Sequence, residues 1–156
     1  MELSEVSFLA ERLLREHGLR DYPTPWSFSF DKAKRRYGQC NHTRRSITMS
    51  KVLIPLMKEE DIQDTLLHEI AHALVGSDHG HDWTWVRKAR EIGCCGVARQ
   101  NKHDTSAVKH KYTLTCPKCG YIVYKEKKSR RGMRQSCGKC SRVFDTSRIF
   151  EWKQNY

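Results

Sequence analysis

The segment His68-Glu69-Ile70-Ala71-His72 carries side chains that can bind and use a metal ion. In an α-helix, residues four apart lie one turn apart on the same face, so His68 and His72 can hold one cation while Glu69 lies on the adjoining flank. This is the His-Glu-x-x-His spacing of zinc hydrolases, in which the two histidines bind Zn²⁺ and the glutamate is the general base. An exposed amphipathic helix that happens to carry two histidines is the alternative interpretation.

A catalytic zinc has three protein ligands and keeps its fourth position for water. His81, nine residues after His72, follows a short reversal and is predicted to be the third ligand, with His79 as the competing candidate. Since Zn²⁺ lowers the pKa of a bound water toward ~7, Glu69 is predicted to accept the proton of that water during attack on a peptide carbonyl. His42, Tyr37 and His79 are candidate oxyanion donors, and the sequence does not select among them.

A second cluster is formed by two Cys-x-x-Cys pairs with seventeen residues between them, Cys116, Cys119, Cys137 and Cys140. Four thiolates in this spacing predict a closed, tetrahedral, structural zinc site, although either pair alone also fits a redox dithiol. A segment of about 45 residues has too small a core to fold unaided, so we expect the metal to stabilise it. Cys40, Cys94 and Cys95 lack ligand spacing and are expected to be small buried apolar residues.

The net charge of +11 is confined to the last third of the chain. Residues 1–97 contain fourteen basic and fourteen acidic residues, whereas residues 98–156 contain fifteen basic and four acidic ones. Because cations contact phosphates and aromatic rings stack on bases, a basic run beside Tyr121 and Tyr124 predicts salt-sensitive, weakly sequence-specific binding of DNA that is single-stranded or has single-stranded regions. A solvated hairpin loop is the alternative. The predicted nucleic-acid contacts are Lys125, Lys127, Lys128, Arg130, Arg131 and Arg134.

Hydrophobic periodicity predicts the elements that must position these residues. Helices are expected over residues 4–17, 58–75 and 83–92. The inner face of the last one is predicted to carry Trp83, Val86, Ala89 or Arg90, and Ile92. Strands are expected over 26–30, 34–40 and 46–49, and, after a polar linker at 98–110, over 112–115, 121–125, 133–136 and 148–152. The predicted fold is α+β, with helices and a short antiparallel sheet in residues 1–108 (linker included) and a β-rich Cys₄ zinc ribbon in residues 109–156.

The sequence also carries an expectation about location. It has no apolar run near the ~20 residues that span a bilayer, and its acidic N-terminus lacks the pattern of a signal peptide. We therefore expect no membrane partner and a reducing compartment, namely the cytoplasm (with nucleoid association) or, in a eukaryote, the nucleus.

The segments His68–Ala73 and Gly80-His81-Asp82-x-x-Trp85 together resemble the SprT-like (Spartan-related) zinc metallopeptidase family. Gly38-x-Cys40, residues 47–50 and the two cysteine pairs are also similar to that family. Its third zinc histidine lies in a Gly-His-Gly-Pro-x-aromatic stretch, and here Asp82-Trp83 replaces Gly-Pro. The resemblance implies a zincin-like domain, one catalytic and one structural Zn²⁺, and protein substrates that are bound or crosslinked to DNA.

Two other functions stay open at this point. The chain could be a non-enzymatic zinc-ribbon protein that binds nucleic acid and keeps a metallopeptidase scaffold, although a scaffold has no need of the Glu69 carboxylate. It could also be a general metallopeptidase that is unrelated to DNA.

Overall fold

The computed structural model describes residues 1–21, 23–98, 108–128 and 134–156. The chain forms two compact units, Met1–Thr105 and Ser106–Tyr156. Among the described residues, no helix is both long and apolar enough to cross a membrane.

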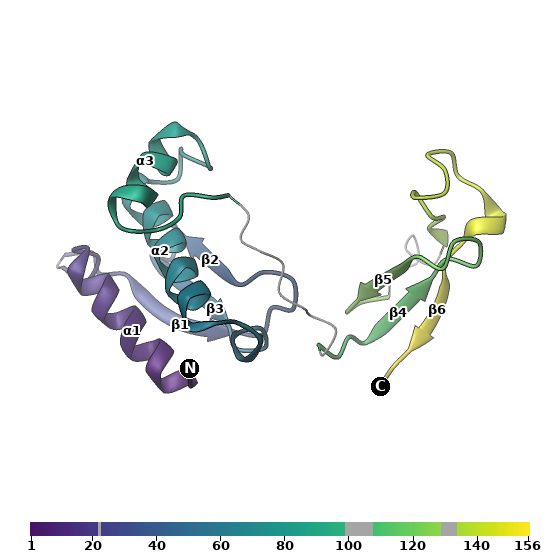
Figure 1. Ribbon diagram of the computed structural model, residues 1–156, viewed down its shortest axis with the longest axis horizontal. Helices are drawn as coiled ribbons and strands as arrows, with labels where there is room; N and C mark the ends of the chain where they lie inside the picture. Colours follow the sequence, from purple (N-terminus) through teal and green to yellow (C-terminus); the bar gives the residue numbers. More distant parts are fainter. Residues whose placement is uncertain (22, 99–107, 129–133) are drawn as a thin grey trace. The chain divides into compact units, whose positions relative to one another are not determined.

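Among its described residues, the first unit contains three α-helices and three strands (Figure 1). The helices lie within one residue of the predicted boundaries, because regularly spaced apolar residues define both their faces and their lengths. In chain order the elements are α1 (Leu3–Glu16), β1 (Ser27–Asp31), β2 (Gly38–Asn41), β3 (Ser46–Ser50), the 3₁₀ helix η1 (Ile54–Leu56), α2 (Glu59–Val75) and α3 (Trp83–Glu91).

The sheet of the first unit has the strand order β1-β3-β2. Strands β2 and β3 are antiparallel, as predicted, but β1 pairs with β3 in parallel. The hairpin of β2 and β3 accounts for this, since a chain that enters along β1 and reverses twice runs along β3 in its first direction. The α+β class is confirmed. Two predictions for this sheet are wrong: β1 runs parallel to β3, and the strand expected over 34–40 begins only at Gly38.

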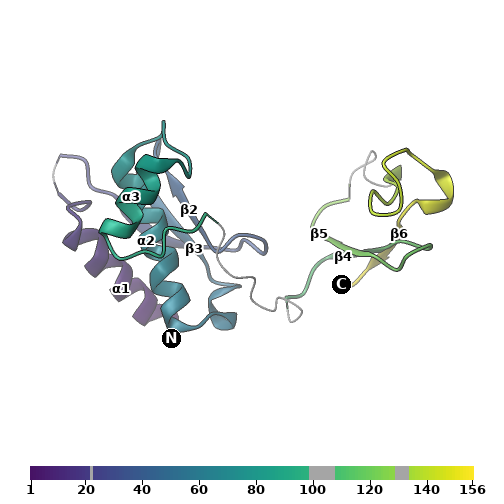
Figure 2. The ribbon, with the colours of Figure 1, turned by 45° about the horizontal axis from the view of Figure 1, so that its top comes forward.

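Helices α1 and α2 lie against the sheet, in front of it in both Figure 1 and Figure 2. Ile62, Leu66 and Ile70 of α2 lie one turn apart along the helix and are buried in the core. The spacing of these apolar residues directs one face of α2 toward the sheet. His68 and His72 lie on the other side of the helix.

The second unit is a three-stranded antiparallel sheet, β4 (Tyr112–Thr115), β5 (Ile122–Lys125) and β6 (Glu151–Gln154), in the order β5-β4-β6. Its buried apolar core is small, with Leu114 and Phe150 beside the cysteines. The strand predicted at 148–152 is displaced, because Asp145 caps the 3₁₀ turn η3 (Thr146–Arg148) and delays the extended chain. Of the strand predicted at 133–136, residue 133 lies outside the described residues, and Ser136 forms an isolated bridge with Ile149.

Most of the predicted linker lies outside the described residues, but its end does not. Val108 and His110 are buried in the second unit. The His110 ring stacks on Tyr124 at 4.7 Å, and its Nδ1 lies 2.8 Å from Glu126 Oε1. The last residues predicted as linker are therefore part of the folded ribbon.

Candidate active site

Three histidine side chains converge beside α2. The Nε2 atom of His81 lies 3.0 Å from that of His68 and 3.1 Å from that of His72. Two nitrogens that share a tetrahedral Zn²⁺ at ~2.0–2.1 Å each lie ~3.3–3.4 Å apart, so these three atoms fit the first shell of one such ion. The structure thus brings together the two histidines of the helical motif and the predicted third ligand.

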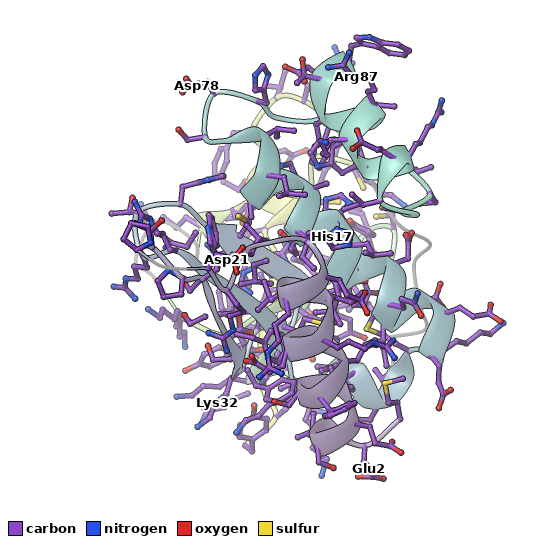
Figure 3. All side chains as sticks on the ribbon, turned by 90° about the vertical axis from the view of Figure 1, so that its left-hand side faces the viewer. Glu2, His17, Asp21, Lys32, Asp78 and Arg87 are labelled. Atoms are coloured by element: carbon purple, nitrogen blue, oxygen red, sulfur yellow. The ribbon has the colours of Figure 1, made fainter. Side chains whose placement is uncertain are left out.

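The loop between α2 and α3 brings His81 to the helix. Gly76 ends α2 with a φ of 92°, a left-handed conformation that glycine adopts without strain. Asp82 then caps α3, because its Oδ1 accepts a hydrogen bond from the backbone N–H of Trp85 at 3.0 Å. Figure 3 shows this end of the unit, where Asp78 labels the loop and Arg87 labels α3.

His79 is not brought into the cluster. Its Nδ1 lies 2.7 Å from Asp82 Oδ2, so the cap of α3 also holds this ring. Geometry therefore separates the two candidates that sequence spacing left open, with His81 facing His68 and His72 and His79 facing Asp82.

The Trp85 ring packs against all three imidazoles. It is completely buried, and its ring centroid lies 4.6 Å from those of His68 and His81 and 5.2 Å from that of His72. Sequence periodicity placed Trp83 on the inner face of α3 instead, and that prediction is wrong, since Trp83 is 73% exposed. The cap at Asp82 sets the helical phase, which turns Trp85 and Ala89 inward, four residues apart.

The electrostatics of the cluster suit a cation. Burial, together with the neighbouring histidines, lowers the pKa of His68 and that of His72 to about 4, so both rings are neutral near pH 7 and can ligate a metal. The buried Nδ1 of His68 has no hydrogen-bond partner among the described residues. Three neutral rings with their nitrogens this close repel one another when all carry Nε2 protons, and a shared cation removes that conflict.

Glu69 directly follows His68 on α2, and its buried carboxylate lies against Gly38 and Cys40 of β2. Burial raises the pKa of its carboxyl to about 7, although the backbone N–H of Cys40 and the charge of Arg36 oppose the rise. A Cβ atom on Gly38 would lie 2.8 Å from both Cγ and Oε1 of Glu69, so only glycine leaves room for the carboxylate there. The sequence did not predict this positioning role of Gly38. The role is seen only because β2 packs against α2 in the structure.

The second predicted metal site lies in the second unit. The Sγ atoms of Cys116 and Cys140 are 3.8 Å apart, those of Cys119 and Cys137 are 3.7 Å apart, and all four lie within 4.8 Å of one another. Two sulfurs that share a tetrahedral Zn²⁺ at ~2.3 Å lie ~3.8 Å apart, so the donors fit that ion. None of the cysteines is in a disulfide.

The predicted nucleic-acid contacts follow β5. Lys127, Lys128 and Arg134 are exposed, and Lys125 is half-buried on the strand. Lys139, which the prediction did not include, lies with its Nζ 4.4 Å from the ring centroid of the exposed Tyr121. Two further predicted contacts, Arg130 and Arg131, lie outside the described residues.

The remaining cysteines differ from the expectation of small buried residues. Cys94 is buried and Cys40 is half-buried, but Cys95 is exposed. Cys94 and Cys95 also lie against Asp64 of α2, and the three residues offer ligand atoms within 4.8 Å of one another.

Comparisons with known proteins identify the family of this chain. The sequence profile of the SprT-like family matches residues 9–110. No curated protein matches the chain. Among solved structures, the crystal structure of the metallopeptidase zymogen of Pyrococcus abyssi abylysin is similar, with 22% identity, a TM-score of 0.43, and coverage of 56% of this chain and 87% of that one.

Proposed function

The chain belongs to the SprT-like family, and on that premise we propose that it is a zinc-dependent endopeptidase acting on proteins bound or crosslinked to DNA. The observation that carries the proposal is the convergence of His68, His72 and His81, with the buried Glu69 directly after His68 on the same helix. We assign one catalytic Zn²⁺ to the three histidines and one structural Zn²⁺ to the four cysteines of the ribbon.

The protein residues have separate tasks in peptide hydrolysis. When bound, Zn²⁺ supplies a Lewis acid that lowers the pKa of water and polarises the substrate carbonyl. Glu69 accepts the proton of the attacking water and passes it to the leaving amine. Gly38 and the backbone N–H of Cys40 hold the Glu69 carboxylate in place, and Trp85 fixes the planes of the histidine rings.

An extended substrate has a surface to bind beside this carboxylate. β2 lies at an edge of its sheet, and the backbone N–H of Cys40 on that strand reaches Glu69. Because an extended peptide can add a strand to a sheet edge through backbone hydrogen bonds, a substrate paired with β2 runs past the general base. Such binding depends on the backbone of the substrate more than on its side chains. It therefore suits an enzyme that cleaves many different proteins.

The basic ribbon supports the part of the proposal that concerns DNA. The excess charge of +11 belongs to residues 98–156, and exposed lysines lie beside exposed tyrosines there. Phosphate contacts raise the local concentration of the enzyme on DNA, where crosslinked proteins are found.

The test is cleavage of a DNA-binding protein by the full chain, with and without single-stranded DNA. Lys127→Glu/Lys128→Glu removes two ribbon cations, and Arg15→Glu/Lys51→Glu makes the same change in charge at exposed positions of the first unit. We expect DNA to stimulate wild-type cleavage, less so as salt rises, and we expect the ribbon variant alone to lose that stimulation.

Other outcomes select the competing functions. Cleavage that ignores DNA in all variants identifies a general metallopeptidase. DNA binding with no cleavage by the zinc-loaded wild type identifies a nucleic-acid-binding protein on a metallopeptidase scaffold.

A further inference from the structure

Asp64 of α2 lies against the segment that follows α3. Gly93 has a φ of 90° and reverses the chain at the end of that helix, so Cys94 and Cys95 return toward α2. The backbone N–H of Cys95 donates to Asp64 Oδ1 at 2.7 Å, its Sγ lies 3.0 Å from Asp64 Oδ2, and the Sγ of Cys94 lies 3.8 Å from the Asp64 carbonyl oxygen. Two sulfurs and a carboxylate from distant parts of the sequence therefore lie close together.

Asp64, Cys94 and Cys95 line a cleft of about 740 Å³. Three carboxylates, those of Glu60, Asp61 and Asp64, line the cleft with a single cation, the guanidinium of Arg90. The excess of negative charge favours a cation, and the open cleft leaves room for a water molecule to complete its coordination shell.

We propose that Asp64, Cys94 and Cys95 form a third metal site, which binds a borderline-soft divalent cation of the Zn²⁺ class. Paired thiolates select such ions over Mg²⁺ and Ca²⁺, and the carboxylate oxygen favours Zn²⁺ over Cu(I). Binding replaces two S–H bonds with two sulfur–metal bonds and releases two protons to solvent. The backbone bond from Cys95 to Asp64 Oδ1 can persist, because Oδ2 is the oxygen that faces the thiol.

The site has a structural consequence for the active site. Asp64 lies one helical turn before His68 on α2, and α3 starts two residues after His81. A cation held by Asp64, Cys94 and Cys95 therefore fastens the far end of α3 to the helix that carries two of the three histidines. This inference does not depend on the proposed peptidase activity.

The test is metal content of the full chain after equilibrium dialysis against Zn²⁺, followed by nuclear magnetic resonance of the cadmium-substituted protein. The variants are Cys95→Ser, Asp64→Asn and Cys94→Ser/Cys95→Ser, with Asp21→Asn as the control matched to Asp64→Asn at an exposed position outside the cluster. The position of a cadmium resonance reports its number of sulfur ligands, so this site is distinguished from the four-sulfur ribbon and from the histidine cluster.

We expect wild type and Asp21→Asn to bind one more equivalent of Zn²⁺ than the three cluster variants, and to show a two-sulfur cadmium resonance that those variants lack. The ribbon and histidine resonances should be present in every protein. Because Cys95 is exposed, Cys95→Ser leaves the core intact and decides the question even if the double variant fails to fold. Equal metal content and equal spectra in wild type and Cys95→Ser would overturn the proposal.

Discussion

The substitution Gly38→Ala tests whether β2 positions the general base. The added Cβ would lie 2.8 Å from Glu69 Cγ and Oε1, whereas ordinary contacts begin at 3.4 Å. The buried Glu69 side chain and β2 must therefore move apart, by about 0.6 Å to reach ordinary contact. Misplacement of a catalytic group by ~1 Å lowers rates ~10²-fold, so we expect kcat to fall by ~10–100-fold. Overpacking of this kind destabilises proteins by ~1–3 kcal/mol, which should lower the midpoint of thermal unfolding.

The assay is steady-state cleavage of a protein substrate, with zinc content and circular dichroism measured on the same samples. Gly80→Ala is the matched control, because its Cβ meets nothing within 4 Å, and its kcat should stay within about a factor of two of wild type. A folded, fully zinc-loaded Gly38→Ala protein with wild-type kcat would show that Glu69 does not depend on this contact.

Three further predictions concern the third zinc ligand, the tryptophan that packs on the histidines, and an aspartate of β1. His81→Ala should remove one Zn²⁺ per chain while His79→Ala keeps it, as metal analysis can check, and equal zinc loss in both would contradict the geometry. Trp85→Ala should lower the free energy of unfolding by ~3–5 kcal/mol, measured by urea denaturation. A loss near zero would mean that packing of this ring does not stabilise the domain. Burial alone would raise the pKa of Asp31, but its hydrogen bonds outweigh burial and lower it. Stability from Asp31 is therefore present above the ordinary carboxyl pKa and lost as pH falls through the lowered one, so Asp31→Asn should be less stable than wild type at neutral pH, with a gap that closes in acid.

The histidines and Glu69 of α2 were predictable because they are local. Helical geometry alone places residues four apart on one face, and apolar residues at the same spacing indicate which face packs on the core. The ribbon cysteines were predictable for a similar reason, since each pair forms within one tight turn. The α+β fold follows from such local patterns and is confirmed.

Other features depend on contacts between distant segments. Sequence spacing favoured His81 over His79 as the third ligand but did not show where the His79 ring lies. In the structure that ring contacts Asp82, the cap of α3. The inward turn of Trp85 follows from the same cap. β1 is parallel to its neighbour because that neighbour is β3 and not β2. The hydrophobic periodicity of the sequence does not indicate which strands pair.

Gly38 and the cluster of Asp64, Cys94 and Cys95 were not predicted for the same physical reason. A glycine in a strand does not reveal which side chain lies against it, and here that neighbour is Glu69, thirty-one residues later. Cys94 and Cys95 have no ligand spacing of their own, and their third donor lies thirty residues earlier on α2. Only the packing of α3 on α2 brings these residues together.

The most direct test of the central claim is proteolysis by Glu69→Gln, with zinc measured on the same preparation. Glutamine fills the space of the carboxylate but cannot accept the proton of the attacking water. We predict full zinc content at the histidine cluster and a loss of cleavage by ~10²–10⁴-fold, the usual contribution of a general base. Cleavage at the wild-type rate by the zinc-loaded variant would contradict the assignment of Glu69 and, with it, the proposed mechanism.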